Sequence, residues 1–239
     1  MRHYPENSLP ALHAAIGAGA RHVEFDVQFS SDGVPVVLHD PDLLRVAGIP
    51  RDIAETDVAA LATIGLDTDT GPVCTVPLLI DTVNLLNGHP GVHAFVELKR
   101  HGIERLGLDN CLRHIGDVLS ASQFPWTLIS FRDDAVRAAA PQLGVPAGWV
   151  LREHSPASRR KAEALEPDYL FCHVEALDFT REPLWDGPWK WVLYDLDDAS
   201  EARALLDRGV DMIETGNILE FLSPGGPSGN PVSRSPYLP

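Results

Sequence analysis

Cysteine is scarce in this chain of 239 residues. Cys74, Cys111 and Cys172 lie far apart in the sequence, and none of them forms a CxxC pair or has the histidine spacing of a zinc site. Because so few cysteines rarely build a disulfide framework, we expect free thiols in a reducing compartment. The cytoplasm is therefore the expected location.

Basic residues and long apolar runs are also lacking. Lys and Arg number 19 against 34 Asp and Glu, which gives a formal net charge of −15 at pH 7. A surface this acidic repels nucleic-acid phosphates and anionic lipid heads. No apolar stretch approaches the roughly 18 to 20 residues that cross a bilayer, and the N-terminus lacks a signal-peptide core. We expect no nucleic-acid partner and no stable membrane insertion, and the sequence does not indicate the oligomeric state.

Apolar, strand-like runs alternate with helical patterns along the chain, which predicts α/β architecture with a parallel sheet. Two arrangements fit this pattern, an open doubly wound sheet and a (β/α)8 TIM barrel. The absence of any GxGxxG or GxxxxGKS motif favours the barrel. The expected barrel strands are seven, at residues 22–28, 93–98, 126–131, 147–151, 168–172, 190–194 and 211–215. A closed barrel needs eight, so we expect the first strand to be missing from this chain.

Two segments are expected to lie outside the regular barrel. VPVVLH (34–39) follows the strand at 22–28 after a short SSDG turn, which suits an antiparallel hairpin and is too short for a parallel crossover. Residues from about 29 to 77 therefore form a small insertion after the second strand of the barrel. Residues 1–222 are the expected barrel domain, and residues 223–239, rich in Pro, Gly and Ser, are expected to be a flexible tail.

Three acidic residues on two of the strands are candidate metal ligands. Residues two apart on a strand point the same way, so Glu24 and Asp26 share one face, and Glu97 shares a face with Lys99. If the two strands are neighbours, the three carboxylates meet at one end of the barrel, where hard oxygen ligands suit Mg²⁺ or Ca²⁺. The alternative is that the acids lie at exposed strand ends in salt bridges.

Lys99 and His39 stand beside these acids in the predicted fold. The Lys99 ammonium group can hold a phosphate oxygen or simply pair with one of the acids. His39 ends the hairpin run immediately before Asp40, and an imidazole beside carboxylates is a candidate general acid or base. A His-Asp pair is common by chance, so the pair alone does not establish catalysis.

Taken together, seven motifs resemble the glycerophosphodiester phosphodiesterase family over nearly the whole chain. They are PENS (5–8), VEFDV (23–27), DGVPVVLHD (32–40), VPLL (76–79), VELK (96–99), ISF (129–131) and GVDMIET (209–215). The resemblance implies a TIM barrel with a small insertion. It also implies hydrolysis of glycerophosphodiesters, small molecules of lipid metabolism, to glycerol 3-phosphate and an alcohol, with one divalent cation, Mg²⁺ or Ca²⁺.

The resemblance also implies roles for individual residues. It makes Glu24, Asp26 and Glu97 the metal ligands and His39 one of two catalytic histidines. It places Lys99 close to the substrate phosphate, and it places Glu6, with Asn7, in a substrate-binding loop at the barrel mouth.

The chain departs from the family pattern at both ends of the barrel. The His-Arg-Gly motif that precedes PEN in the family, with the second catalytic histidine, is absent. We expect the natural reading frame to extend upstream by about 10 to 20 residues, one strand and its loop, and a chain without that histidine to lose about 10² to 10⁴ in rate. The last strand carries Glu214-Thr215-Gly216 instead of Thr-Asp, and Tyr194 stands in place of a common tryptophan, which leaves substrate preference open.

Two other functions fit the sequence. A non-catalytic barrel would keep the three acids for a structural cation and bind a phosphorylated ligand or a partner protein. A lysophospholipid phosphodiesterase would use the same metal chemistry on a lipid, and an apolar groove near Trp185, Trp189 and Trp191 would favour it. Tryptophans this close together are more often core residues.

Overall fold

A single curled sheet organises the computed structural model, which describes residues 4–67, 74–178, 183–222 and 232–233. Its strand order is β11-β10-β9-β8-β7-β6-β5-β1-β2, and β11 pairs with both β10 and β1. All neighbours are parallel except β1 and β2. The ring consists of β1 (His22–Phe29), β5 (His93–Leu98), β6 (Trp126–Ser130), β7 (Ala147–Leu151), β8 (Tyr169–His173), β9 (Lys190–Tyr194), β10 (Met212–Thr215) and β11 (Val232–Ser233).

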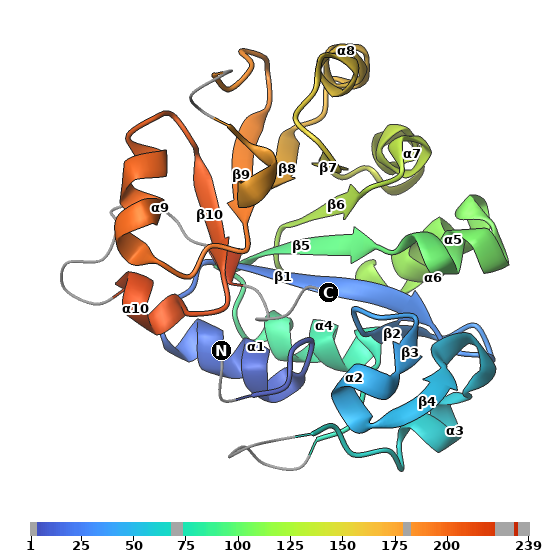
Figure 1. Ribbon diagram of the computed structural model, residues 1–239. Helices are drawn as coiled ribbons and strands as arrows, with labels where there is room; N and C mark the ends of the chain where they lie inside the picture. The colour runs from blue at the N-terminus through green and yellow to red at the C-terminus, as the bar shows by residue number, and fades with distance from the viewer. Residues whose placement is uncertain (1–3, 68–73, 179–182, 223–231, 234–239) are drawn as a thin grey trace.

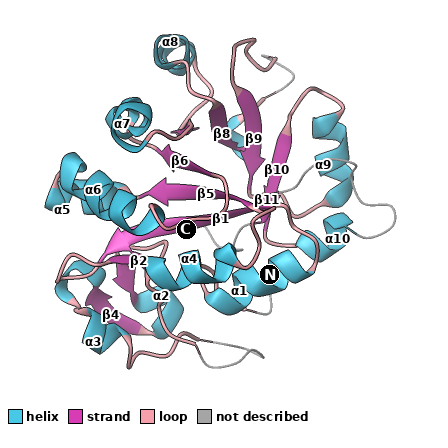
Figure 2. Ribbon diagram, turned by 180° about the vertical axis from the view of Figure 1, so that it is seen from behind, coloured by secondary structure: helices cyan, strands magenta, loops and turns pink. Residues whose placement is uncertain are grey.

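Helices surround this ring on the outside (Figures 1 and 2). They are α1 (Leu9–Gly17), α4 (Leu79–Asn87), α5 (Arg100–Leu106), α6 (Leu108–Leu119), α7 (Asp133–Leu143), α8 (Pro156–Leu165), α9 (Ala199–Leu206) and α10 (Ile218–Leu222), with a short 3₁₀ turn at Val174–Ala176. The predicted parallel α/β barrel is therefore present, and the seven predicted strands all form.

The eighth position of the ring is filled from the C-terminal segment. Val232 of β11 pairs with His22 on one side and with Glu214 on the other. The expected flexible tail, 223–239, otherwise lies outside the described residues. Two residues are enough to bridge the C-terminal half of β10 and the N-terminal start of β1, so β11 links the last strand to the strand that carries Glu24 and Asp26.

Helix starts follow the capping residues in the sequence. The Ser155 hydroxyl accepts a hydrogen bond from the backbone N–H of Ser158, and Pro156 occupies the first turn of α8. Asp198 caps α9 in the same way, and Ser8 caps α1. The Ser8 cap fixes where the loop containing Glu6 and Asn7 ends and the helix begins.

The insertion forms a small unit with its own core next to β1 (Figure 1). Its strand β2 runs antiparallel to β1, with Val37 opposite Val27, as the short turn predicts. Its core contains apolar residues from every part of the segment, among them Val36, Leu38 and Leu61. The described elements are β2 (Pro35–Val37), β3 (Asp42–Leu43), α2 (Leu44–Ala47), β4 (Ile49–Asp52), a 3₁₀ turn at Ile53–Glu55, and α3 (Val58–Leu61). Residues 68–73 lie outside the description.

Side chains from alternate strand positions fill the barrel interior. They form a cluster separate from the larger core between sheet and helices. This interior cluster contains Phe95, Ile129, Val150, Phe171, Val192, Tyr194 and Met212. Gly148 leaves room for it, because a Cβ there would lie 2.9 Å from the Ile129 side chain. The apolar layer supports the polar end of the barrel that lies next to it.

Two histidines lie at the N-terminal end of the barrel interior. The rings of His22 and His93 are 5.7 Å apart, and His93 Nε2 lies 2.9 Å from the Thr127 hydroxyl. Burial, and after it electrostatic repulsion from His22 and Lys190, together lower the pKa of His93 from 6.5 to about 4. Burial also lowers the pKa of His22, with Lys190 and Arg21 acting in the same direction. Both rings are therefore neutral in the folded protein near pH 7.

We expect this pair to make the fold sensitive to acid. In the unfolded chain His93 takes up a proton near pH 6.5, whereas in the folded protein it stays neutral down to about pH 4. The free energy of unfolding is therefore highest above pH 6.5 and decreases as the pH falls from 6.5 to about 4. After a discount for solvent screening of the partly exposed ring, His93 accounts for about 2 kcal/mol of this loss. In urea unfolding at pH 7.5 and 4.5, His93→Gln should lose about 2 kcal/mol less than the wild type. The exposed His13, changed to Gln, is the control, and an equal loss in all three proteins would contradict the assignment.

No helix in the described part of the chain is both long and apolar enough to cross a bilayer.

Candidate active site

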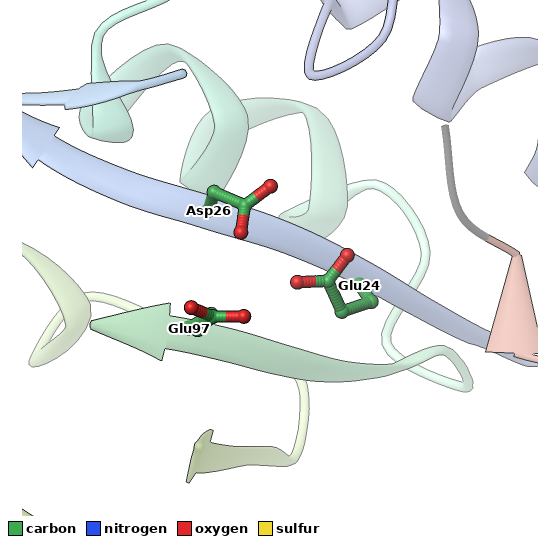
Figure 3. A group of neighbouring side chains, drawn as sticks. All are labelled: Glu24, Asp26 and Glu97. Atoms are coloured by element: carbon green, nitrogen blue, oxygen red, sulfur yellow. The ribbon is translucent and has the colours of Figure 1, made fainter. Parts of the chain in front are cut away.

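Three carboxylates from β1 and β5 converge on one point inside the barrel (Figure 3). Glu24, Asp26 and Glu97 each offer an oxygen, and these oxygens all lie within 4.8 Å of one another. These residues are 6%, 1% and 3% exposed. Of the residues that the structure describes, this is the one group of three or more acidic, histidine or cysteine side chains compact enough to hold a metal ion.

The register of the two strands produces this convergence. β1 and β5 are parallel neighbours with Asp26 opposite Glu97 and Glu24 opposite Phe95. Since side chains alternate along a strand, all four point into the barrel, and Phe95 belongs to the interior apolar cluster. The apolar residues between the acids, such as Phe25, face the helices instead and are fully buried there.

The charges at this site fit a divalent cation. Lys99 Nζ lies 3.0 Å from Asp26 Oδ1 and 2.9 Å from Glu97 Oε1, so one positive charge faces three buried carboxylates. Buried carboxylates without compensation repel each other and lose their hydration, which is costly. Beside them is a cavity of about 30 Å³, room for an ion and a water rather than for a whole substrate. The oxygen donors, their spacing and this space suit Mg²⁺ or Ca²⁺.

Asn7 fixes the position of Asp26. Its side-chain oxygen accepts a hydrogen bond from the Asp26 backbone N–H at 2.9 Å, and its amide nitrogen donates to Asp26 Oδ2 at 2.8 Å. Asn7 has a positive φ of 52°, a conformation that Asn tolerates better than most residues. The loop before α1 therefore contributes to the geometry of the carboxylate group.

His39 reaches the same cavity from the end of the hairpin. It lines the cavity together with Glu24 and Glu97, and its backbone carbonyl accepts a hydrogen bond from the Gln28 side chain at 3.1 Å. Its Nδ1 lies 2.7 Å from Asp40 Oδ1.

Arg45 and Glu6 complete the environment of this histidine. Burial raises the pKa of Asp40, but hydrogen bonds from Arg45 and His39 outweigh it, and the pKa lies below its usual value. Ionised Asp40 accepts only, so His39 Nδ1 must donate to it, which leaves Nε2 as the ring nitrogen available to the cavity. Arg45 Nε lies 2.6 Å from Asp40 Oδ2, and Arg45 also pairs with Glu6. These carboxylates raise the pKa of Arg45 against the opposing effect of burial.

Residues 1–219 match the sequence model of the glycerophosphoryl diester phosphodiesterase family. The chain belongs to this family. It is 33% identical over 100 residues to a glycerophosphodiester phosphodiesterase of Bacillus altitudinis, and 56% identical over 36 residues to glycerophosphodiester phosphodiesterase 1 of Rattus norvegicus. The first match covers 40% of this chain and 40% of the relative, and the second covers 15% and 11%.

Solved structures confirm the TIM-barrel fold. An Oleispira antarctica phosphodiesterase, in complex with the product sn-glycerol-3-phosphate, matches with a TM-score of 0.75 and 24% identity, over 88% of this chain and 87% of that one. A glycerophosphodiester phosphodiesterase from Thermotoga maritima matches with a TM-score of 0.70 and 23% identity, over 92% of both chains.

Not every residue implied by the family resemblance lies at the cavity of this phosphodiesterase-family barrel. Glu24, Glu97 and His39 line it, and Asp26 belongs to the acidic group beside it. Lys99 had two expected arrangements, holding a phosphate oxygen or pairing with an acid. In the structure it pairs with two of the acids, Asp26 and Glu97. Glu6 pairs with Arg45.

Two residues of the site were not predicted from the sequence. Arg45 lies on a four-residue helix of the insertion and meets Glu6 across 39 positions, and no motif marks it. Glu214 of β10 is 2% exposed and lines the same cavity. Its alternation with Met212, an interior residue, was visible in the sequence and is the signal that could have placed it inside the barrel.

Proposed function

We propose that this protein hydrolyses glycerophosphodiesters to glycerol 3-phosphate and an alcohol with the help of one divalent cation, Mg²⁺ or Ca²⁺. The observation that carries the proposal is the convergence of Glu24 and Asp26 of β1 with Glu97 of β5, with His39 lining the same cavity. Family membership supports the reaction class.

The roles of the chain's own residues follow from their contacts. Glu24, Asp26 and Glu97 would hold the cation, and a bound cation polarises the phosphodiester and neutralises charge that develops on it. The cavity is too small for the substrate, so the phosphodiester would lie at its mouth, within reach of the Lys99 ammonium group. Asp40, held by Arg45, keeps Nδ1 of His39 protonated, so Nε2 can take a proton from an attacking oxygen or return one to the leaving alcohol.

An assay of glycerol 3-phosphate release from glycerophosphocholine tests this proposal. We expect release in the presence of Mg²⁺ or Ca²⁺, loss of release with EDTA, and recovery when the cation is restored. Release that persists in EDTA would contradict the cation's role. No release above the level of a variant lacking Glu97 would contradict the reaction itself.

A non-catalytic barrel remains the alternative, with the acids holding a structural cation. It would bind Ca²⁺ with no release of glycerol 3-phosphate, and changing His39 would alter nothing measurable. The lysophospholipid alternative loses its expected support, because Trp185, Trp189 and Trp191 are 3%, 6% and 4% exposed and belong to the main core. The three tryptophans pack inside the protein and do not offer an apolar groove.

A further inference from the structure

Glu214 lies inside the barrel beside the proposed cation site. On β10 it follows Met212 by two positions, and Met212 packs in the interior apolar cluster, so both side chains face inward. Glu214 lines the cavity of about 30 Å³ together with Glu24, Glu97 and His39. In the ring of strands, β5 lies on one side of β1, and β11 followed by β10 lies on the other. Glu214 therefore reaches the cavity from the side of β1 opposite to Glu97.

Its distance from the acidic group points to an indirect contact with the cation. Glu214 does not belong to the group whose oxygens lie within 4.8 Å of one another. A hard cation takes six or more oxygen ligands, so three carboxylates leave positions for water. Most of the remaining cavity wall is apolar, formed by Ile129, Phe131, Val150 and Phe171, and Tyr194 is the other polar residue that lines it. Glu214 is therefore one of the few polar side chains that can accept a hydrogen bond from a water on this side.

We propose that Glu214 is a positioning residue that orients the hydration shell of the cation from the β10 side of the cavity. This inference rests on the proposed function, because it assumes a cation between Glu24, Asp26 and Glu97. Partners of this kind affect metal affinity as well as activity, since they orient the ligands and add favourable charge near the ion. A fourth carboxylate at the cavity also adds repulsion when no cation is bound, so its removal should stabilise the cation-free protein.

Calorimetric titration of the full chain with CaCl₂ tests the inference without any substrate. Glu214→Gln should weaken Ca²⁺ binding by about 10- to 100-fold and reduce the rise in Tm that Ca²⁺ produces. Glu214→Asp keeps the charge and should retain most of the affinity. Glu220→Gln, which removes one negative charge from the exposed side of α10, is the matched control and should behave as the wild type.

The outcomes separate this inference from the proposed function. A Glu214→Gln protein that binds Ca²⁺ as tightly as the wild type, with Tm lowered equally with and without Ca²⁺, would show a purely structural role and overturn the inference alone. A wild-type protein that binds neither Ca²⁺ nor, in the same titration with MgCl₂, Mg²⁺ would overturn both. If Glu214→Gln does not fold, Glu214→Met takes its place, because its apolar side chain suits the neighbouring rings. Weakened Ca²⁺ binding in this variant supports the inference, and wild-type binding overturns it.

Discussion

Glu97→Gln is expected to lower the rate of glycerol 3-phosphate release by about three orders of magnitude. The substitution keeps the size of the side chain and removes one negative charge from a group whose oxygens lie within 4.8 Å of one another. At contact distance, that charge is worth several kcal/mol of attraction for a dication. The affinity for Ca²⁺ should fall with the rate, and both can be measured on the same preparation.

Glu104→Gln is the matched control for this variant. Glu104 lies on α5, the helix that follows β5, where it pairs with Arg100 and is more than half exposed. Its removal should change neither Ca²⁺ binding nor the rate. A Glu97→Gln protein that keeps wild-type affinity for Ca²⁺ would show that the cation binds elsewhere.

His39→Ala should reduce the rate by about 10² to 10⁴ while leaving Ca²⁺ affinity within a few-fold of the wild type. The imidazole lines the cavity but is not among the three carboxylates, so its loss removes proton transfer and not cation binding. Rates and Ca²⁺ affinities measured together separate these two effects. The combination distinguishes a catalytic role from a loss of the site as a whole.

His101→Ala is the control for this second variant. His101 also follows a strand of the barrel, but it lies 3.3 Å from Asp52 of the insertion and does not line the cavity. It should retain the wild-type rate. An unchanged rate in His39→Ala would favour the non-catalytic alternative, provided that the wild type itself turns over substrate.

Local patterns in the sequence were sufficient to predict most of the barrel and the acidic group. Alternation within VEFDV and FVELK places Glu24, Asp26 and Glu97 on the inward faces of their strands. Parallel pairing of β1 and β5 then sets Asp26 directly opposite Glu97. The SSDG turn predicts the antiparallel hairpin that ends near His39. These features depend on neighbours in sequence and on the two-residue period of a strand, which is why they can be read without a structure.

Contacts between distant segments could not be predicted in this way. The Arg45 side chain joins Asp40 and Glu6 only after the insertion has folded against the loop before α1. β11 takes the eighth place in the ring through main-chain pairing with His22 and Glu214, and a two-residue strand in a segment rich in Pro, Gly and Ser has no recognisable period. Both depend on which surfaces meet in space, information that one sequence does not carry locally.

A crystal of this protein soaked in MnCl₂ and examined by anomalous diffraction gives the most direct test of the cation site. We expect one strong anomalous peak in the barrel, with oxygens of Glu24, Asp26 and Glu97 within about 2.0 to 2.6 Å of it. A peak at another place, or none at this group when the crystal holds Mn²⁺ elsewhere, would contradict the account.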